Sequence, residues 1–301
     1  MATILITGCS SGIGKATALT LARAGHRVFA TMRSPERSAD LAATAAAEAL
    51  PLTVHRLDVD SCLSVDQCFD SISQQAPHID VLINNAGIER HGSTEELSLD
   101  DFRSIMETNY FGAIRCIRKL LPSMRQRGQG CIINVTSVSG RIASSPLGAY
   151  SASKHALEAL SEALAQEMKP FGVRVHIVQP GIIDTPMAHA IEDPPPSKYR
   201  QIAHLSALFR ASLQHPTPPS VVADVIKDVI ESGTWKLRHT AGPDAAPFLT
   251  WRAAMSDEEW VGFNSLDTAG FRDRVKRDFG KIGRASCRER VTILVVGCTS
   301  Q

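Results

Sequence analysis

Short apolar runs that favour β-strands alternate with helical patterns along most of this chain. The runs are continuous and do not alternate with polar residues, which is typical of strands covered on both faces of a parallel sheet. We expect strands at 3–7, 27–31, 53–57, 81–84, 131–135, 173–178 and 235–240, and helices at 15–24, 99–126, 149–169 and 220–232. This alternation predicts a single α/β domain with a doubly wound, seven-stranded parallel sheet and helices on both faces.

The charge of the chain is almost balanced, with 32 Lys and Arg residues and 31 Asp and Glu residues. A formal net charge of +1 gives no general attraction to nucleic acid or to an anionic membrane surface. The apolar runs are far shorter than the roughly 18 residues of a membrane span, and no basic segment precedes the first run. We therefore expect a soluble, cytoplasmic protein that binds neither nucleic acid nor a membrane.

The seven cysteines form no Cys-x-x-Cys pair and lie near no cluster of histidines. An odd number without such a pair argues against a disulfide framework and against structural zinc. We expect free thiols and no metal site.

One irregular, proline-rich stretch at 186–219 follows an expected strand, and an insertion of this length usually carries function. We expect 186–219 to form a lid on a catalytic domain that spans 1–245. The candidate apolar contacts of this lid with a substrate are Met187, Leu205, Leu208 and Phe209. Residues 246–281 form a C-terminal extension to which no motif assigns a role.

The last segment of the chain, 282–301, has a different origin in our interpretation. The stretch from Ile282 to Val291 matches, codon by codon, the translation of a common sequencing adapter. We expect 282–301 to be a non-native tail produced by adapter read-through. The alternative is a genuine terminal strand, because 291–296 has β character.

A glycine-rich segment, Thr7–Gly14, follows the first expected strand and opens the first expected helix. Glycines at 8, 12 and 14 permit a tight turn and let the backbone approach a pyrophosphate, while the helix N-terminus supplies N–H donors and a positive dipole. This strand, turn and helix context indicates a Rossmann-type site for a dinucleotide cofactor.

The end of the second strand indicates which dinucleotide binds. Enzymes that prefer NAD usually carry an acidic residue there, about 20 residues after the glycine-rich segment, which accepts hydrogen bonds from the ribose hydroxyls. This chain has Arg33 and Ser34 there, so no carboxylate would repel a 2′-phosphate, and Arg33 and the Ser11 hydroxyl can donate to it. We expect NADP, with NAD as the less favoured cofactor.

Tyr150 and Lys154 begin a strongly helical segment and lie one turn apart on the same face. The reference pKa of a phenol is about 10, and an ammonium group within a few ångströms favours the phenolate. The preceding strand ends in Asn134–Ser137, so Ser137 can donate to the same reacting oxygen. The pattern predicts proton transfer by Tyr150.

Together these motifs resemble those of the short-chain dehydrogenase/reductase family in its compact, single-domain form. The match covers about residues 3–245 in the expected order and spacing. It rests on Thr7–Gly14, Asn84–Gly87, Asn109, Ser137, Tyr150 with Lys154, and Pro180 with Gly181. The resemblance implies an oxidoreductase that interconverts an alcohol and a carbonyl group with a nicotinamide cofactor.

The resemblance implies a role for each catalytic residue. Tyr150 would be the general acid in carbonyl reduction and the general base in alcohol oxidation, while Ser137 would orient and polarise the substrate oxygen. Lys154 would hold the nicotinamide ribose and lower the pKa of Tyr150. Asn109 would anchor a water that connects Lys154 to solvent, through a local break in its helix. Ser139 is a competing hydroxyl, but the spacing of Ser137 from Tyr150 fits the family better.

The resemblance also implies the cofactor contacts. They are Gly8, Ser10, Ser11, Gly12, Ile13, Gly14 and Arg33; Asp58 and Val59 beside the adenine; Asn85, Ala86 and Gly87 under the adenine ribose; Tyr150 and Lys154; and Pro180, Gly181, Ile183 and Thr185 around the carboxamide. For Asp58 the alternative is a cap at the end of a strand.

A finer similarity links 6–14, 28–33 and 242–245 to the branch that contains 17β-hydroxysteroid and all-trans-retinol dehydrogenases. It implies a small hydrophobic alcohol or ketone, steroid-like or retinoid-like, as the substrate. Helices such as 99–126 and 149–169 often pair between subunits in this family, which implies a homodimer or homotetramer.

Two other functions stay open at this point. A catalytically idle NADP-binding regulator would need a defect in the catalytic set, and the sequence shows none. An enzyme like the nucleotide-sugar epimerases and dehydratases of the longer related branch would need a different spacing between Gly8 and Gly12 and a distinct sugar domain.

Overall fold

The computed structural model describes residues 1–194 and 196–285. Residues 286–301 lie outside the described residues, and with them most of the expected non-native tail and the alternative strand at 291–296.

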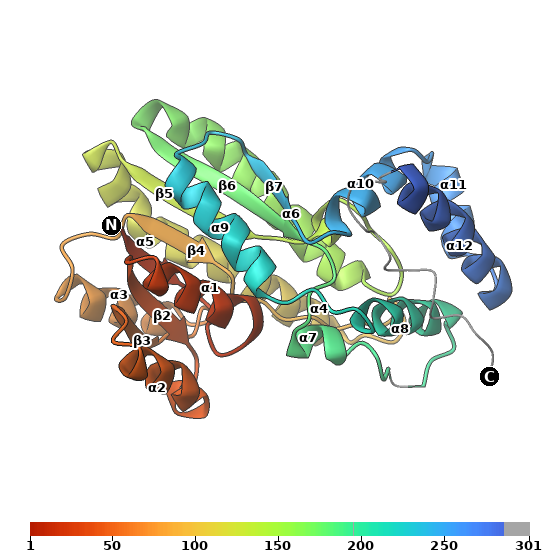
Figure 1. Cartoon of the computed structure of the whole chain (residues 1–301), viewed down its shortest axis with the longest axis horizontal. Helices are drawn as coiled ribbons and strands as arrows, with labels where there is room; N and C mark the ends of the chain where they lie inside the picture. Colours follow the sequence, from red (N-terminus) through yellow and green to blue (C-terminus); the bar gives the residue numbers. More distant parts are fainter. Residues whose placement is uncertain (195, 286–301) are drawn as a thin grey trace.

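Seven parallel strands form one sheet in the order β3-β2-β1-β4-β5-β6-β7 (Figure 1). They are β1 (Thr3–Ile6), β2 (Arg27–Met32), β3 (Leu52–Arg56), β4 (Val81–Asn84), β5 (Gly130–Val135), β6 (Val173–Pro180) and β7 (Arg238–Ala241). The strand order reverses between β1 and β4, which opens a crevice for a ligand at the carboxyl ends of these strands. The predicted doubly wound sheet is confirmed. Its last strand starts later than expected, because pairing with β6 begins only where Ile177 meets Arg238.

Helices cover both faces of the sheet, as expected for strands that are apolar throughout. On one face lie α1 (Gly12–Arg23), α2 (Ala39–Ala47) and α9 (Ser220–Ser232), and on the other α3 (Cys62–Ser73), α5 (Gly112–Arg127) and α6 (Gly148–Met168), with α4 (Leu99–Met106) packed against α6. Ile4 and Ile6 of β1 pack into the first core layer, whereas Leu5 packs into the second. Each strand therefore needs apolar side chains on both of its faces.

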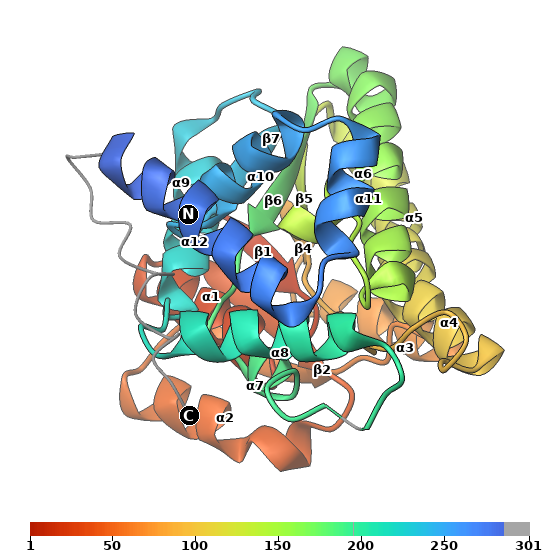
Figure 2. The same ribbon diagram turned by 90° about the vertical axis from the view of Figure 1, so that its right-hand side faces the viewer.

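The remaining helices lie beyond the carboxyl ends of the strands, and Figure 2 shows α8 and α12 in front of the sheet. They are α7 (Pro186–His189), α8 (Arg200–Leu213), α10 (Ala245–Ala253), α11 (Asp257–Asn264) and α12 (Thr268–Ala285). Apolar side chains of α8, α10, α11 and α12 form a separate core that includes Phe248, Trp260 and Phe263. None of the described helices is both long enough and apolar enough to cross a membrane.

A buried carboxylate joins α6 to the end of β5, to β6 and to the start of β7. Glu158, which is 3% exposed, accepts hydrogen bonds from Thr136 Oγ1 at 2.8 Å, Gln179 Nε2 at 2.9 Å and Arg238 Nε at 2.9 Å. Because a buried charge is tolerated only when it is paired and hydrogen-bonded, this network fixes the end of the sheet from which the candidate site projects.

We predict that Glu158→Ala lowers the free energy of unfolding by about 3 kcal/mol, because it leaves Arg238 and Thr136 without their shared acceptor. Glu162 also pairs with Arg238, but its side chain is 53% exposed, so Glu162→Ala should cost less than about 1 kcal/mol. Chemical denaturation of both variants measures the difference. Equal losses would contradict a role of the buried network in stability.

Candidate active site

The glycine loop between β1 and α1 leaves space for an anion at the helix N-terminus. A Cβ at Gly14 would lie 2.2 Å from the carbonyl oxygen of Gly8, so only glycine lets the helix pack this closely against the turn. The N-cap Ser11 makes no side-chain capping bond, and the first turn of α1 carries no acidic residue. Backbone N–H groups and the helix dipole are thus available to a phosphate.

Asn85 holds this loop in position. Its Nδ2 donates to the carbonyl oxygens of Thr7 and Gly8, both at 3.0 Å, and Thr7 Oγ1 accepts from the backbone N–H groups of Asn85 and Ala86, also at 3.0 Å. The side-chain amide of Asn85, which we expected under the adenine ribose, is thus used within the protein to attach the loop to the end of β4.

Asn109 lies in a π-helical segment, Glu107–Phe111, between α4 and α5. The break that we expected in this helix is present, and π-bulges are frequent at functional sites. Asn109 is 1% exposed; its Oδ1 accepts from Ile88 N at 2.8 Å, and its Nδ2 donates to Ile88 O and Ser153 Oγ, both at 2.9 Å. It therefore fixes the backbone just after Gly87.

Tyr150 and Lys154 project from α6 toward the end of β5. Lys154 Nζ donates to Val135 O at 3.1 Å and lies 5.6 Å from the centroid of the Tyr150 ring. Burial raises the pKa of Tyr150, the hydrogen bond with Ser137 lowers it, and the carboxylate of Glu89 raises it further. Burial also lowers the pKa of Lys154 to about 8.

These shifts differ from the expectation that Lys154 lowers the pKa of Tyr150. The ammonium lies over the ring, and burial disfavours the charged forms of both groups. Ser137 is the group that favours the phenolate here. It also accepts a hydrogen bond from Ser139 N at 3.0 Å, so the competing serine belongs to the turn that follows Ser137.

One continuous cavity of about 670 Å³ brings the candidate residues together. Every residue that we predicted for catalysis or cofactor binding lines it, with the exception of Asn109, which lies behind Ile88. Arg33 at the end of β2 lines one part of the cavity, and Ser137 and Tyr150 line another. Asp58 Oδ1 accepts a hydrogen bond from Asp60 N at 3.1 Å, so the Asp58 carboxylate also supports the turn that follows β3.

Asp244 supports the segment after β6 that we expected around the carboxamide. It is 5% exposed, and its Oδ2 accepts from Ile182 N at 2.8 Å. A Cβ at Gly181 would lie 2.0 Å from Asp244 Oδ1, which explains the glycine. The buried carboxyl group of Asp244 thus positions this segment, and its burial raises the pKa of Asp244.

The C-terminal extension, to which the sequence motifs assigned no role, forms an aromatic wall of the cavity. The wall consists of Phe248, Trp251, Trp260, Phe263 and Phe271. Trp251 packs edge to face against Trp260 and Phe263, with ring centroids 5.4 and 5.0 Å apart. The concentration of aromatic residues after Pro247 is the sequence signal that could have indicated this wall.

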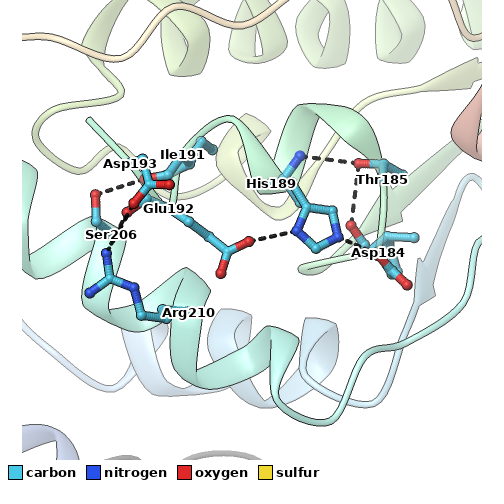
Figure 3. Close-up of polar contacts among 10 residues, drawn as sticks. Asp184, Thr185, His189, Ile191, Glu192, Asp193, Ser206 and Arg210 are labelled. Atoms are coloured by element: carbon cyan, nitrogen blue, oxygen red, sulfur yellow. Dashed lines mark hydrogen bonds and ion pairs between the residues drawn. The ribbon is translucent and has the colours of Figure 1, made fainter. Parts of the chain in front are cut away.

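Residues of α7 and α8 also line the cavity, among them Met187, Leu205, Leu208 and Phe209, which we expected to contact a substrate. Polar contacts attach α7 to its surroundings (Figure 3): His189 Nδ1 lies 2.5 Å from Glu192 Oε1, and His189 Nε2 lies 2.8 Å from Asp184 Oδ1. Ser206 Oγ of α8 donates to Ile191 O at 2.7 Å. The hydrogen bonds with Glu192 and Asp184 raise the pKa of His189, so protonation strengthens the attachment of α7.

The fold and this site define a class of protein, and comparison with known proteins agrees. Residues 2–195 match the family model described as short chain dehydrogenase. The chain belongs to the short-chain dehydrogenase/reductase family, whose members are oxidoreductases.

Individual relatives extend over most of the chain. It is 38% identical to retinol dehydrogenase 8 of Bos taurus over 267 residues, which cover 83% of this chain and 85% of that protein. It is 40% identical to 3-ketodihydrosphingosine reductase of Bacteroides thetaiotaomicron over 182 residues, 60% of this chain and 64% of that protein. A solved short-chain dehydrogenase from Streptomyces avermitilis superposes with a TM-score of 0.73 at 33% identity, covering 88% of this chain and 98% of that one.

We predict that Lys154→Met makes the protein more stable at neutral pH. The pKa of Lys154 in the folded protein, about 8, is below its ordinary value of 10.5, so folding must desolvate an ammonium group that the unfolded chain keeps in water. Removing the charge should raise Tm at pH 7 by about 5 °C.

The sign of the pH dependence gives a second readout. Between the two pKa values the unfolded chain binds more protons, so wild-type stability rises with pH and the gap to Lys154→Met narrows. Thermal unfolding from about pH 7 to about pH 9.5 measures this, with exposed Lys169→Met as the control. A stability difference between wild type and Lys154→Met that does not change with pH would contradict the proposed cost of burying the Lys154 ammonium group.

Proposed function

We propose that this chain is an NADP-dependent oxidoreductase that interconverts an alcohol and a carbonyl group on a hydrophobic substrate. The observation that carries the proposal is that Tyr150, Ser137 and Lys154 line the same cavity as the glycine loop. One substrate oxygen could then contact a proton-transfer group and a second hydroxyl, next to a binding site for a dinucleotide.

The residues around the glycine loop fit a dinucleotide. The close approach of Gly14 to the carbonyl of Gly8 and the free donors at the start of α1 suit a pyrophosphate. When bound, the nicotinamide supplies or accepts the hydride, and the protein contributes orientation and proton transfer.

The chain's own residues would then act on the substrate oxygen as follows. The Ser137 hydroxyl donates a hydrogen bond that orients the oxygen, and the Tyr150 hydroxyl gives it a proton during carbonyl reduction. In the direction of alcohol oxidation, Tyr150 takes this proton back. The raised pKa of Tyr150 keeps the phenol protonated, which suits the role of proton donor. Lys154, whose Nζ donates to Val135 O, would hold the nicotinamide ribose.

The preference for NADP rests on Arg33. Its exposed side chain lines the cavity just after β2, where NAD-preferring enzymes carry an acidic residue. A guanidinium group there can pair with a 2′-phosphate.

We predict that the protein binds NADPH at least about tenfold more tightly than NADH, and that Arg33→Asp reverses the order because its carboxylate repels the 2′-phosphate and accepts from the ribose hydroxyls. Fluorescence titration with both cofactors measures the affinities. Arg103→Asp, on the exposed surface of α4, is the control and should keep the wild-type order. A wild-type protein that prefers NADH would contradict the assignment of Arg33.

A hydrophobic substrate is supported by the aromatic wall and by the apolar side chains of 186–219 on the same cavity. Burying an apolar ligand against such side chains contributes about 25 cal/mol per Å² of apolar surface. The names of two relatives, retinol dehydrogenase 8 and 3-ketodihydrosphingosine reductase, agree with this class.

We predict that Tyr150→Phe lowers kcat by about 1000-fold while NADPH binding is retained, because only the transferable proton is lost. Tyr199→Phe is the matched control: Tyr199 bonds to Glu95 outside the cavity, so turnover should stay near the wild-type value. NADPH absorbance followed with a panel of hydrophobic ketones, aldehydes and alcohols measures both. Near-normal turnover by Tyr150→Phe would refute the proposed mechanism.

A further inference from the structure

A buried serine near the start of α6 takes no part in the mechanism above. Ser153 lies between Tyr150 and Lys154 in the sequence and is 0% exposed. Its Oγ accepts a hydrogen bond from Asn109 Nδ2 at 2.9 Å and donates one to the backbone carbonyl of Tyr150 at 2.7 Å. Ser153 therefore joins the π-helical segment Glu107–Phe111 to the part of α6 that carries Tyr150 and Lys154.

The same Asn109 side chain also holds the loop after β4. Its Oδ1 accepts from Ile88 N at 2.8 Å, and its Nδ2 donates to Ile88 O at 2.9 Å. This loop passes beside Lys154, because a Cβ added at Gly87 would lie 3.6 Å from Lys154 Nζ and 3.3 Å from Asn109 Oδ1. One amide side chain thus binds the loop directly and binds α6 through Ser153.

The two elements that Asn109 and Ser153 connect contribute different parts of the cavity. The loop after β4 includes Asn85, Ala86 and Gly87, which we expect to contact the cofactor, whereas α6 carries Tyr150. Proton transfer and hydride transfer to one substrate require that the proton donor and the cofactor keep a fixed separation. A displacement of about 1 Å can lower the rate about 100-fold.

We propose that Ser153 is a positioning residue, which sets the place of Tyr150 relative to the cofactor-binding loop by holding Asn109 against α6. The inference rests on the proposed function and goes beyond it, because it assigns a role to a residue outside the predicted catalytic and cofactor-binding sets. Removing the Ser153 hydroxyl should loosen this connection and leave every group that contacts substrate or cofactor in the chain.

The chain offers a closely matched control about two turns further along α6. Ser161 is also 0% exposed, and its Oγ accepts from Asn134 Nδ2 at 2.8 Å and donates to Leu157 O at 2.6 Å. Ser161→Ala therefore removes the same two kinds of hydrogen bond from the same helix. These bonds join α6 to β5, however, and not to the loop after β4.

The first measurement compares the kinetics of the two variants. Ser153→Ala should lower kcat about tenfold while KM and the Kd for NADPH stay within about twofold of wild type, because alignment and not binding is impaired. Ser161→Ala should leave kcat within about twofold of wild type, although both variants should lower Tm by a similar amount. NADPH absorbance, followed below both Tm values with the compound of the hydrophobic panel that wild type reduces fastest, gives kcat and KM. Fluorescence titration with NADPH gives Kd.

Hydrogen exchange at Ile88 gives a readout that needs no turnover. The Ile88 N–H is bonded to Asn109 Oδ1, so its protection depends on how firmly Asn109 is held. Ser153→Ala should accelerate exchange in the peptide that contains Ile88 about tenfold, whereas Ser161→Ala should leave it unchanged.

A double-mutant cycle tests whether Ser153 acts through Asn109. Asn109→Ala already cuts the connection between Ser153 and the loop, so adding Ser153→Ala should lower kcat by less than a further factor of about two. A further tenfold loss would overturn the proposal, because Ser153 would then act by another route.

A conservative variant tests the hydrogen bonds themselves. Ser153→Cys keeps a weak donor and a weak acceptor at the same position, so its kcat should lie between those of wild type and Ser153→Ala. If Ser153→Ala does not fold, the comparison with Ser161→Ala is made with Ser153→Cys. Wild-type kcat in the Ser153 variants, or equal losses of kcat in the Ser153 and Ser161 variants, would overturn the proposal.

Failure of the proposed function gives a different result. The wild-type protein itself would then reduce no compound of the panel, and both proposals would fall together. A wild-type protein that turns over through Tyr150, with Ser153→Ala as active as Ser161→Ala, would refute only the role of Ser153.

Discussion

Lys154 is buried beside Tyr150, and the arrangement of much of the surrounding structure is tied to this burial. An ammonium group in this position has lost most of its hydration, and its hydrogen-bond acceptor in the protein is the carbonyl of Val135. The neighbouring elements are fixed by buried polar groups: Asn109 holds the loop after β4, and Glu158 holds the end of β5, β6 and the start of β7. These contacts attach α6, which carries Tyr150 and Lys154, to the loop after β4 and to the sheet.

Local spacing made much of this site predictable. The turn at Gly8–Gly14 and the pair Tyr150 and Lys154 each lie within one or two helical turns of chain, so their geometry follows from secondary structure alone. The order of the β-rich runs then determines which loops meet at the carboxyl ends of the strands. For this reason the predicted cofactor and catalytic residues converge on one cavity.

The parts that were missed depend on contacts between distant segments. The loop after β4 is fixed by Asn109 and Pro146, and neither is near it in sequence. Asp244 is recognisable as a support only when β6 and the turn after β7 are seen together. The pKa of Tyr150 was also misjudged, because spacing indicates the charge of Lys154 but not the extent of burial.

The C-terminal helices and the rest of the chain contribute different things to the cavity. Trp260 Nε1 donates to Ala143 O at 2.7 Å, and Phe271 stacks on His204 of α8 at a centroid distance of 4.4 Å, so α10–α12 are attached to the rim of the cavity and to α8, which also lines it. These helices contain none of the predicted catalytic or cofactor-binding residues. Exchanging these helices would therefore change the shape of the substrate-binding space and leave the residues for hydride and proton transfer unchanged. Substrate specificity could then change, in evolution or by design, independently of the catalytic residues.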